Sequence, residues 1–176
     1  MSLATFAMGL FVVLAVAWRL TSLARSRANE KGLRRAGAVE VGAGASLALT
    51  LAHVAIYLGA IGEAIARGFW LDGVAAVGLA LYGFGAAMLA LVIRDLGRVW
   101  TVKVFIAPDH VLVRTWLFRT FRHPNYILAI LPELVGLCLA LHAVVTLICG
   151  LPLYAALLWI RIRLEEAAMR ERFPAY

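Results

Sequence analysis

The chain has 176 residues, of which 64% are hydrophobic and only 15% are charged, and its formal net charge is +7. Soluble domains are roughly half apolar, so this composition excludes an ordinary soluble domain and indicates an integral membrane protein. The positive charge alone is compatible with nucleic-acid binding. Its distribution along the chain indicates membrane topology instead, and no nucleic-acid partner is expected.

Five apolar stretches approach the roughly 20 residues that a helix needs to cross a bilayer. The predicted spans are Leu3–Leu20, Val41–Gly62, Gly73–Ile93, about Tyr126–Leu141 and Ala143–Ile160. They predict an all-α polytopic membrane protein in a single domain, residues 1–176. The last two spans are expected to form a hairpin that turns near His142, followed by a charged C-terminal helix. In the third span Gly78, Gly83 and Gly85 are expected where helix backbones approach closely.

The basic residues are distributed asymmetrically between the two ends of these spans. Of the 17 Lys and Arg residues, only Arg67 falls on one side. The others lie on the opposite side. They are Arg19 and the basic residues of the loop at residues 21–40, of the polar segment Arg94–Arg122 and of the tail. An excess of this kind in short loops marks the cytoplasmic side. The N-terminus is therefore expected outside, and the polar segment and the C-terminus in the cytoplasm.

The segment Arg119-Thr-Phe-Arg-His-Pro-Asn-Tyr126 concentrates polar side chains directly before an apolar region. Arg122 and His123 carry donors suited to a carboxylate or phosphate, and Tyr126 adds a ring and a hydroxyl. Pro124 disfavours a helical conformation at His123 and is itself suited to open a helix. His123 is therefore expected at a helix mouth, where free amide groups favour an anion. The alternative is that these residues only anchor a helix at the lipid head groups.

The start of the tail adds a second polar group. Arg161 and Glu165 are four residues apart and Arg163 and Glu166 are three apart, so each pair shares a helical face. Antiparallel packing of the last two spans returns this group to the level of His123. The expected result is a cytoplasmic cleft that opens into lipid and suits a zwitterionic cofactor and a lipid-like acceptor. A solvated helix end is the alternative.

Two ionisable side chains lie at membrane depth. Glu133 is costly in lipid and marks either the lining of an acceptor pocket or a structural hydrogen bond within the bundle. His53 is expected to be a satisfied, hydrogen-bonded histidine between helices, with a functional role as the alternative.

The segment Arg122-His-Pro-Asn-Tyr126, with Arg161-x-x-x-Glu165-Glu166 and Phe173-x-x-Tyr176 downstream, resembles the isoprenylcysteine carboxyl methyltransferase family. Its members are membrane methyltransferases that use S-adenosylmethionine. One departure is that the family's Gly-Pro-Tyr before the motif is Trp116-Leu117-Phe118 here.

Motifs upstream resemble a bacterial branch of that family, some members of which methylate long-chain phenolic lipids. They are Asn29-Glu30, Gly37-Ala-Val-Glu40 and Leu96-Gly-Arg-x-Trp100. The resemblance implies a location in the bacterial inner membrane, in contact with membrane lipids.

The resemblance also implies site residues and ligands. S-adenosyl-L-methionine would be the cofactor and S-adenosyl-L-homocysteine the product, with no metal, and the cofactor site would fall within residues 94–176. The implied cofactor-binding residues are Lys103, Val104, Val113, Thr115, Arg119, Arg122, His123, Tyr126, Glu165 and Glu166. Arg161 would position the acceptor, and Glu165 or Glu133 would act as base if that acceptor is a hydroxyl. The acceptor would be an isoprenylcysteine carboxylate or a long-chain phenolic or hydroxyl lipid that enters from the bilayer.

Two other functions remain open. An NADPH-dependent sterol-type membrane reductase carries a similar Arg-His-Pro-Asn-Tyr segment, but this chain has little cytoplasmic length to hold a dinucleotide. A non-enzymatic lipid-binding helix bundle would need no cofactor.

Overall fold

The computed structural model describes residues 2–106 and 115–172, and it confirms an all-α fold with one short strand pair. Four helices are long and apolar enough to cross a membrane. The helices are α1 (Leu3–Arg35), α2 (Ala43–Arg67), α3 (Gly73–Leu96), α4 (Trp116–Thr120), α5 (Leu131–Ala140) and α6 (Leu151–Arg172). Shorter segments are the 3-10 turn η1 (Gly97–Val99), the π-helical turns η2 (Asn125–Ile130) and η3 (Thr146–Gly150), and the strands β1 (Val39–Val41) and β2 (Val104–Ile106). The chain is an integral membrane protein.

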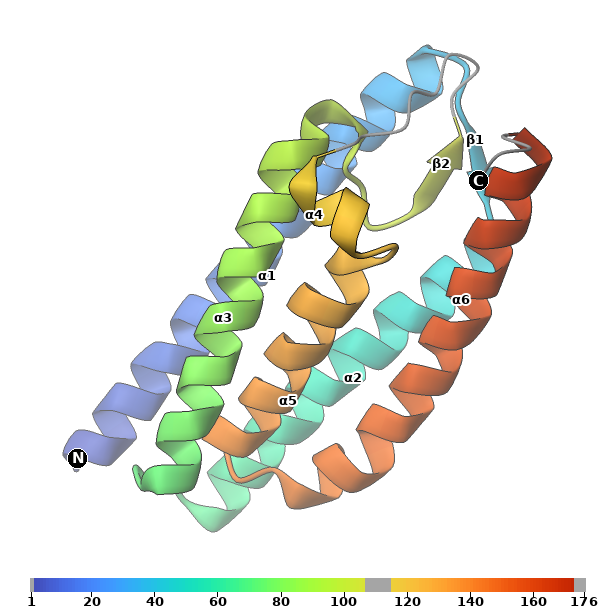
Figure 1. Ribbon diagram of the computed structural model, residues 1–176. Coiled ribbons are helices and arrows are strands. Elements are labelled where there is room, and N and C mark those ends of the chain that lie inside the picture. The colour runs from blue at the N-terminus through green and yellow to red at the C-terminus, as the bar shows by residue number, and fades with distance from the viewer. Residues whose placement is uncertain (1, 107–114, 173–176) are drawn as a thin grey trace.

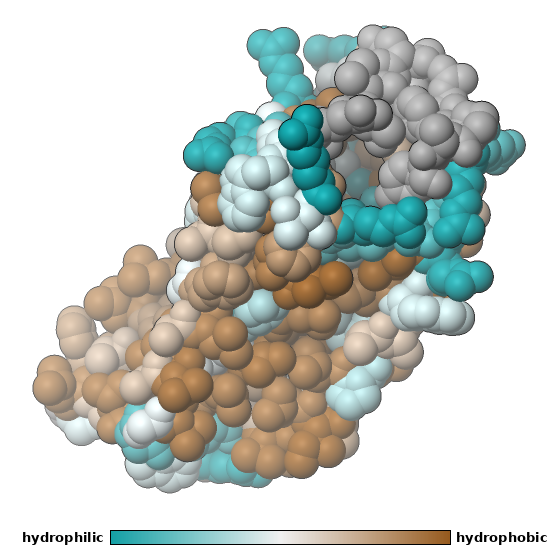
Figure 2. All heavy atoms as spheres, in the orientation of Figure 1, coloured by the Kyte–Doolittle hydropathy of each residue, from teal (hydrophilic) through white to brown (hydrophobic). Residues whose placement is uncertain are grey.

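The long helices run side by side along one bundle, with α1 starting at one end and α6 finishing at the other (Figure 1). The strands and α4 lie at the end where α1, α3 and α6 finish. Apolar residues cover most of the visible face, and hydrophilic ones gather at the end that carries the strands (Figure 2). Large side chains such as Leu51, Ile65, Val77 and Ile148 are exposed, as expected for a surface in contact with lipid.

The first helix differs from the prediction. It continues for 33 residues to Arg35, so most of the stretch predicted as a basic loop is helical. Good helix formers (Ala, Arg, Leu, Lys and Glu) make up most of residues 21–35. This stretch contains one glycine, Gly32, and no proline. At 1.5 Å per residue the helix is about 50 Å long, which exceeds the roughly 30 Å hydrocarbon core. Arg19, predicted at the end of a span, therefore lies in mid-helix.

The predicted fourth span is also different in length. The helix formed by η2 and α5 has 16 residues, from Asn125 to Ala140, and is shorter than the four candidate spans. It ends where His142 adopts a positive φ of 53°, which turns the chain toward η3. The hairpin at His142 is thus confirmed, with one short and one long arm.

Helices α3 and α5 pack with their backbones in direct contact at glycine positions. A Cβ atom on Gly136 would lie 2.4 Å from the Tyr82 nitrogen and 2.7 Å from the Gly78 oxygen. A Cβ atom on Gly85 would lie 2.7 Å from the Glu133 nitrogen. The prediction of close approach is confirmed for Gly78 and Gly85 but is wrong for Gly83, which faces open space.

Replacing Gly136 by alanine is expected to destabilise the bundle, because α3 and α5 must then move apart. Overpacking of this kind costs about 1–3 kcal/mol or more. Gly83→Ala on α3 is the matched control and should lose no stability, since no atom lies within 4 Å of its Cβ position. Thermal unfolding of the detergent-solubilised protein measures both. Equal melting temperatures for the two variants would contradict this packing.

The strands tie the end of α1 to the segment after α3. Strand β1 pairs antiparallel with β2, with Val39 opposite Ile106 and Val41 opposite Val104. The Asn29 side chain donates to the carbonyls of Gly97 (3.0 Å) and Trp100 (2.7 Å). The upstream motifs noted in the sequence therefore meet at this end of the bundle.

Candidate active site

The centre of the candidate site is the buried pair of Tyr126 and Arg161. Pro124 has a helical φ of −63° and directly precedes η2, as predicted, which places Tyr126 in the first turn. The Arg161 Nε donates to the Tyr126 hydroxyl at 2.9 Å, and that hydroxyl donates to Glu165 Oε2 at 2.8 Å. Arg161 is only 4% exposed although it carries a charge. Helix α6 thus returns to the start of η2, as expected for an antiparallel hairpin.

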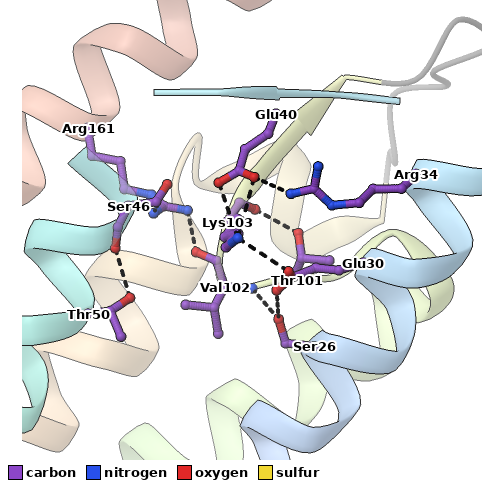
Figure 3. A network of polar contacts seen from close by, with 10 residues as sticks. All are labelled: Ser26, Glu30, Arg34, Glu40, Ser46, Thr50, Thr101, Val102, Lys103 and Arg161. Atoms are coloured by element: carbon purple, nitrogen blue, oxygen red, sulfur yellow. Dashed lines mark hydrogen bonds and ion pairs between the residues drawn. The ribbon is translucent and has the colours of Figure 1, made fainter. Parts of the chain in front are cut away.

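Arg161 is also bound by two groups that the sequence analysis did not identify. Its Nη1 donates to Ser46 Oγ on α2 at 3.0 Å, and its Nη2 donates to the Val102 carbonyl. The Val102 amide in turn donates to Ser26 Oγ on α1 at 2.9 Å. Figure 3 shows these contacts converging from three parts of the chain. A guanidinium has five donors in a fixed fork, so this arrangement fixes its orientation.

A second polar pair lies beside the first. His123 Nε2 is 3.2 Å from Glu166 Oε1, and the His123 ring stacks on the Tyr126 ring with centroids 5.9 Å apart. Glu166 also forms ion pairs with Arg122 (4.0 Å) and Arg170 (3.2 Å). His123 is buried and Glu166 is half-buried. The structure therefore brings together half of the predicted cofactor-binding residues, namely Arg122, His123, Tyr126, Glu165 and Glu166, at the start of η2 and on α6.

The other predicted cofactor residues lie elsewhere. Lys103 sits between Glu30 and Glu40, 3.5 Å and 3.3 Å from their carboxylates, as Figure 3 shows. Val104 opens β2 and lies opposite a β1 residue, so it takes part in the strand pair.

The remaining three predicted residues flank α4. Thr115 directly precedes this helix. Arg119 is exposed on α4 and forms no side-chain hydrogen bond or ion pair within the described part of the chain. Val113 lies outside the described residues. The helix itself occupies the place of the family's Gly-Pro-Tyr turn, and Leu117 at its centre is fully buried against the α3 residues Leu89 and Val92.

Deeper in the bundle lies a second group of polar side chains. Glu133 is fully buried and accepts hydrogen bonds from Arg19 Nη1 (3.3 Å) and the Tyr57 hydroxyl (2.7 Å). The Tyr57 hydroxyl is 3.0 Å from that of Tyr82, and Arg19 Nη2 is 3.5 Å from His53 Nδ1. Both oxygens of Glu133 are thus occupied. Among the described residues His53 is hydrogen-bonded through Nδ1 to a neighbouring helix, as expected, and its Nε2 has no protein partner.

The two groups are related by a spacing of seven residues on four helices. The outer polar layer comprises Ser26, Ser46, Tyr126 and Arg161. The inner polar layer comprises Arg19, His53, Glu133 and Tyr154, whose ring lies 5.8 Å from that of His53. Seven residues are two helical turns, or about 10 Å. This spacing becomes visible only once it is known which helix faces which, so no signal for Ser26, Ser46 or Arg19 is present in the sequence by itself.

A cavity of about 160 Å³ connects the two layers. Arg161, Tyr126 and Asn125 line its outer end, and Arg19 and His53 line its inner end. Most of the remaining lining residues are apolar, and those on α1 and α2 include the exposed side chains Leu20 and Val54. The cavity therefore borders the lipid-facing surface between these two helices. Glu133 is not among the residues that line it.

Comparison with known proteins identifies the family of the chain. The model of the isoprenylcysteine carboxyl methyltransferase (ICMT) family matches residues 77–171, which include both partners of the Tyr126–Arg161 pair. The chain belongs to this family. The ICMT match does not include α1 or α2, which supply Arg19, Ser26, Ser46 and His53.

Two relatives extend over nearly the whole chain. An uncharacterized protein of Haemophilus influenzae is 44% identical over 159 residues, covering 90% of this chain and 92% of its own length. The uncharacterized protein YpbQ of Bacillus subtilis is 29% identical over 166 residues, covering 92% of this chain and 96% of its own. No solved structure matches the chain.

Proposed function

We propose that this ICMT-family protein is an S-adenosylmethionine-dependent O-methyltransferase that acts on a lipid-like acceptor. One observation supports this above the others: the buried Arg161–Tyr126–Glu165 chain stands at the end of an apolar cavity that borders the lipid-facing surface. Such a cavity suits an apolar tail, and the polar chain at its end suits an oxygen head group.

The residues around His123 fit the polar part of the proposed cofactor. S-adenosylmethionine carries an ammonium, a carboxylate and ribose hydroxyls. Glu165 and Glu166 are acceptors for the ammonium or the hydroxyls, while Arg122 and His123 are donors for the carboxylate. The contact between His123 Nε2 and Glu166 Oε1, with Arg122 beside it, places donors for a carboxylate next to acceptors for an ammonium, as a site for a zwitterion requires.

The chemistry requires an aligned oxygen and an acceptor for its proton. S-adenosylmethionine supplies a sulfonium methyl group, so that the acceptor oxygen forms the new O–CH₃ bond while the S–CH₃ bond breaks and sulfur becomes a neutral thioether. Arg161 would hold the negatively charged oxygen, since its guanidinium faces the cavity and is fixed from three sides. For a hydroxyl acceptor, Glu165 Oε2 would take the proton through the Tyr126 hydroxyl, which already donates to it. An ionised carboxylate acceptor would need no base.

The proposal includes the orientation predicted from the basic residues, with the outer polar layer on the cytoplasmic side. The outer layer lies at the same end of the bundle as the hydrophilic surface in Figure 2. This would let a soluble cofactor reach His123 from the cytoplasm while the acceptor enters from the bilayer.

Calorimetry with S-adenosylmethionine and with NADPH separates the three candidate functions. We expect S-adenosylmethionine to bind and NADPH not to bind. His123→Ala and Glu166→Gln should each weaken the binding by about tenfold or more, because each removes a charge-assisted contact worth roughly 1.5–3 kcal/mol. The exposed Glu171 on the same helix gives the matched control, Glu171→Gln, which should bind normally.

The other outcomes identify the alternatives. Binding of NADPH alone would indicate the reductase. Binding of neither cofactor would indicate a lipid-binding bundle. Normal binding by both site variants would show that the His123–Glu166 pair is only a solvated helix end.

A further inference from the structure

The cavity is lined by residues with polar atoms that have no protein partner. His53 Nε2, Trp100 Nε1 and Asn125 Oδ1 are buried and make no hydrogen bond to any described residue. All three residues line the cavity, and Trp100 is only 3% exposed. Buried polar groups in native proteins are nearly always hydrogen-bonded, so a cluster of unpaired ones around a cavity indicates that molecules occupying the cavity supply the partners.

The free nitrogen of His53 is a donor. Arg19 Nη2 lies 3.5 Å from Nδ1, and a guanidinium can only donate, so Nδ1 acts as the acceptor. In a neutral imidazole the hydrogen is then on Nε2. The inner end of the cavity thus offers an N–H group that needs an oxygen.

This end of the cavity is suited to a neutral oxygen. The positive charge of Arg19 is already paired with the fully buried Glu133 at 3.3 Å. The inner polar layer therefore carries one cation and one anion, and an anionic group there would lie close to the Glu133 carboxylate. A ketone, ester carbonyl or hydroxyl accepts from His53 without adding charge.

The distance between the two polar ends follows from the helix spacing. His53 lies seven residues beyond Ser46, and Ser46 binds Arg161 at the outer end. Two helical turns place the His53 level about 10 Å from the Arg161 level. The lining between these levels is mainly apolar, including Leu49 and Ile130.

We infer that the acceptor is a long-chain amphiphile with a second, neutral oxygen about 10 Å from the oxygen that is methylated, and that His53 donates a hydrogen bond to it. This inference rests on the proposed function for the identity of the first oxygen. The second oxygen and its recognition by His53 are properties of the cavity alone.

Two probes of equal chain length test this inference: a long-chain alkylphenol, and the same alkylphenol with a ketone about 10 Å from the phenolic oxygen. Binding to the detergent-solubilised protein is measured by calorimetry. We expect wild type to bind the ketone probe about two- to tenfold more tightly, as one net hydrogen bond predicts. His53→Leu should abolish this preference. Thr50→Val, one turn away, should keep it, since the Thr50 hydroxyl already donates to the Ser46 carbonyl at 2.8 Å.

Infrared spectroscopy of a ketone probe labelled at the carbonyl gives a test that does not depend on a variant. The carbonyl stretch should move to lower frequency on binding to wild type if an N–H group donates to it. Equal affinity for the two probes, an unshifted carbonyl band, or a preference that persists in His53→Leu would each overturn the inference. The inference would also be overturned if neither of the two probes bound to the protein.

Methyl transfer to the probes is measured separately with labelled S-adenosylmethionine. If the ketone preference holds but neither probe is methylated, the proposed function fails and the inference about the cavity stands. If both probes are methylated at equal rates and bind equally, the proposed function stands and the inference fails.

Discussion

Replacing Arg161 by methionine is expected to lower methyl transfer at least about a hundredfold. The change removes the cation that contacts Tyr126, Ser46 and Val102, and it leaves the Tyr126–Glu165 pair without its positive partner. Removing a group that stabilises the reacting oxygen in the transition state typically costs about 10²–10³ in rate, because each 1.4 kcal/mol of lost transition-state stabilisation is a factor of ten. Initial rates of transfer from labelled cofactor to a long-chain alkylphenol measure the effect.

Two further variants make the interpretation specific. Arg163 is two residues away on the same helix, is exposed and lies over the Trp159 ring, so Arg163→Met controls for loss of a charge from α6. It should retain nearly full activity. Arg161→Lys keeps the charge but cannot make three bonds in a planar fork, and its rate should fall between those of wild type and Arg161→Met. Near-normal activity in Arg161→Met would remove this residue from the proposed site.

The pH profile of the same assay bears on the acceptor. A phenol has a pKa near 10, so its methylation should respond to pH through its own ionisation or that of its base. A carboxylate is already ionised above about pH 6, and its methylation should be nearly flat there. A guanidinium binds both a carboxylate and a phenolate, so the pH profile and not the identity of Arg161 distinguishes the two proposed acceptors.

The C-terminal part of the site was predictable because it depends on local rules. Two helices joined by a tight turn must pack antiparallel, so Arg161, Glu165 and Glu166 had to return to the level of His123. Pro124 marked the start of the helix for a steric reason that holds in any context. The all-α membrane fold followed equally directly from composition.

The contributions of α1 and α2 were not predictable in the same way. Serine is a common residue in membrane helices. Ser26 and Ser46 bind the Val102 amide and Arg161 only because of the way in which the helices face one another. The basic residues after Arg19 were interpreted as a loop because charge usually ends a span. Here Arg19 is stabilised within the bundle by Glu133, so its helix continues. Recognising this would have required knowing that the Arg19 side chain reaches Glu133 of α5, which hydropathy does not encode.

Arg19→Met is expected to be the most destabilising single substitution in the inner polar layer. It leaves the fully buried Glu133 carboxylate without a cation, at a cost of about 3–5 kcal/mol. Glu133→Leu should cost less, because Arg19 is 22% exposed and its long side chain can extend toward water or lipid head groups. The double variant Arg19→Met/Glu133→Leu should recover most of the stability, since it removes both charges together. Thermal unfolding of the four proteins in detergent gives the coupling energy as a double-mutant cycle.

Activity of the double variant then decides the role of Glu133. Both of its oxygens are occupied by Arg19 and Tyr57, and it does not line the cavity, so the geometry favours a structural role. A stable double variant that still methylates a phenolic acceptor would leave Glu165 as the base. A stable but inactive one would show that Glu133 takes part in the reaction, as the sequence allowed. A loss of stability in the double variant equal to the sum of the two single losses would mean that the two charges are not coupled, and the ion pair would then not be what stabilises the inner polar layer.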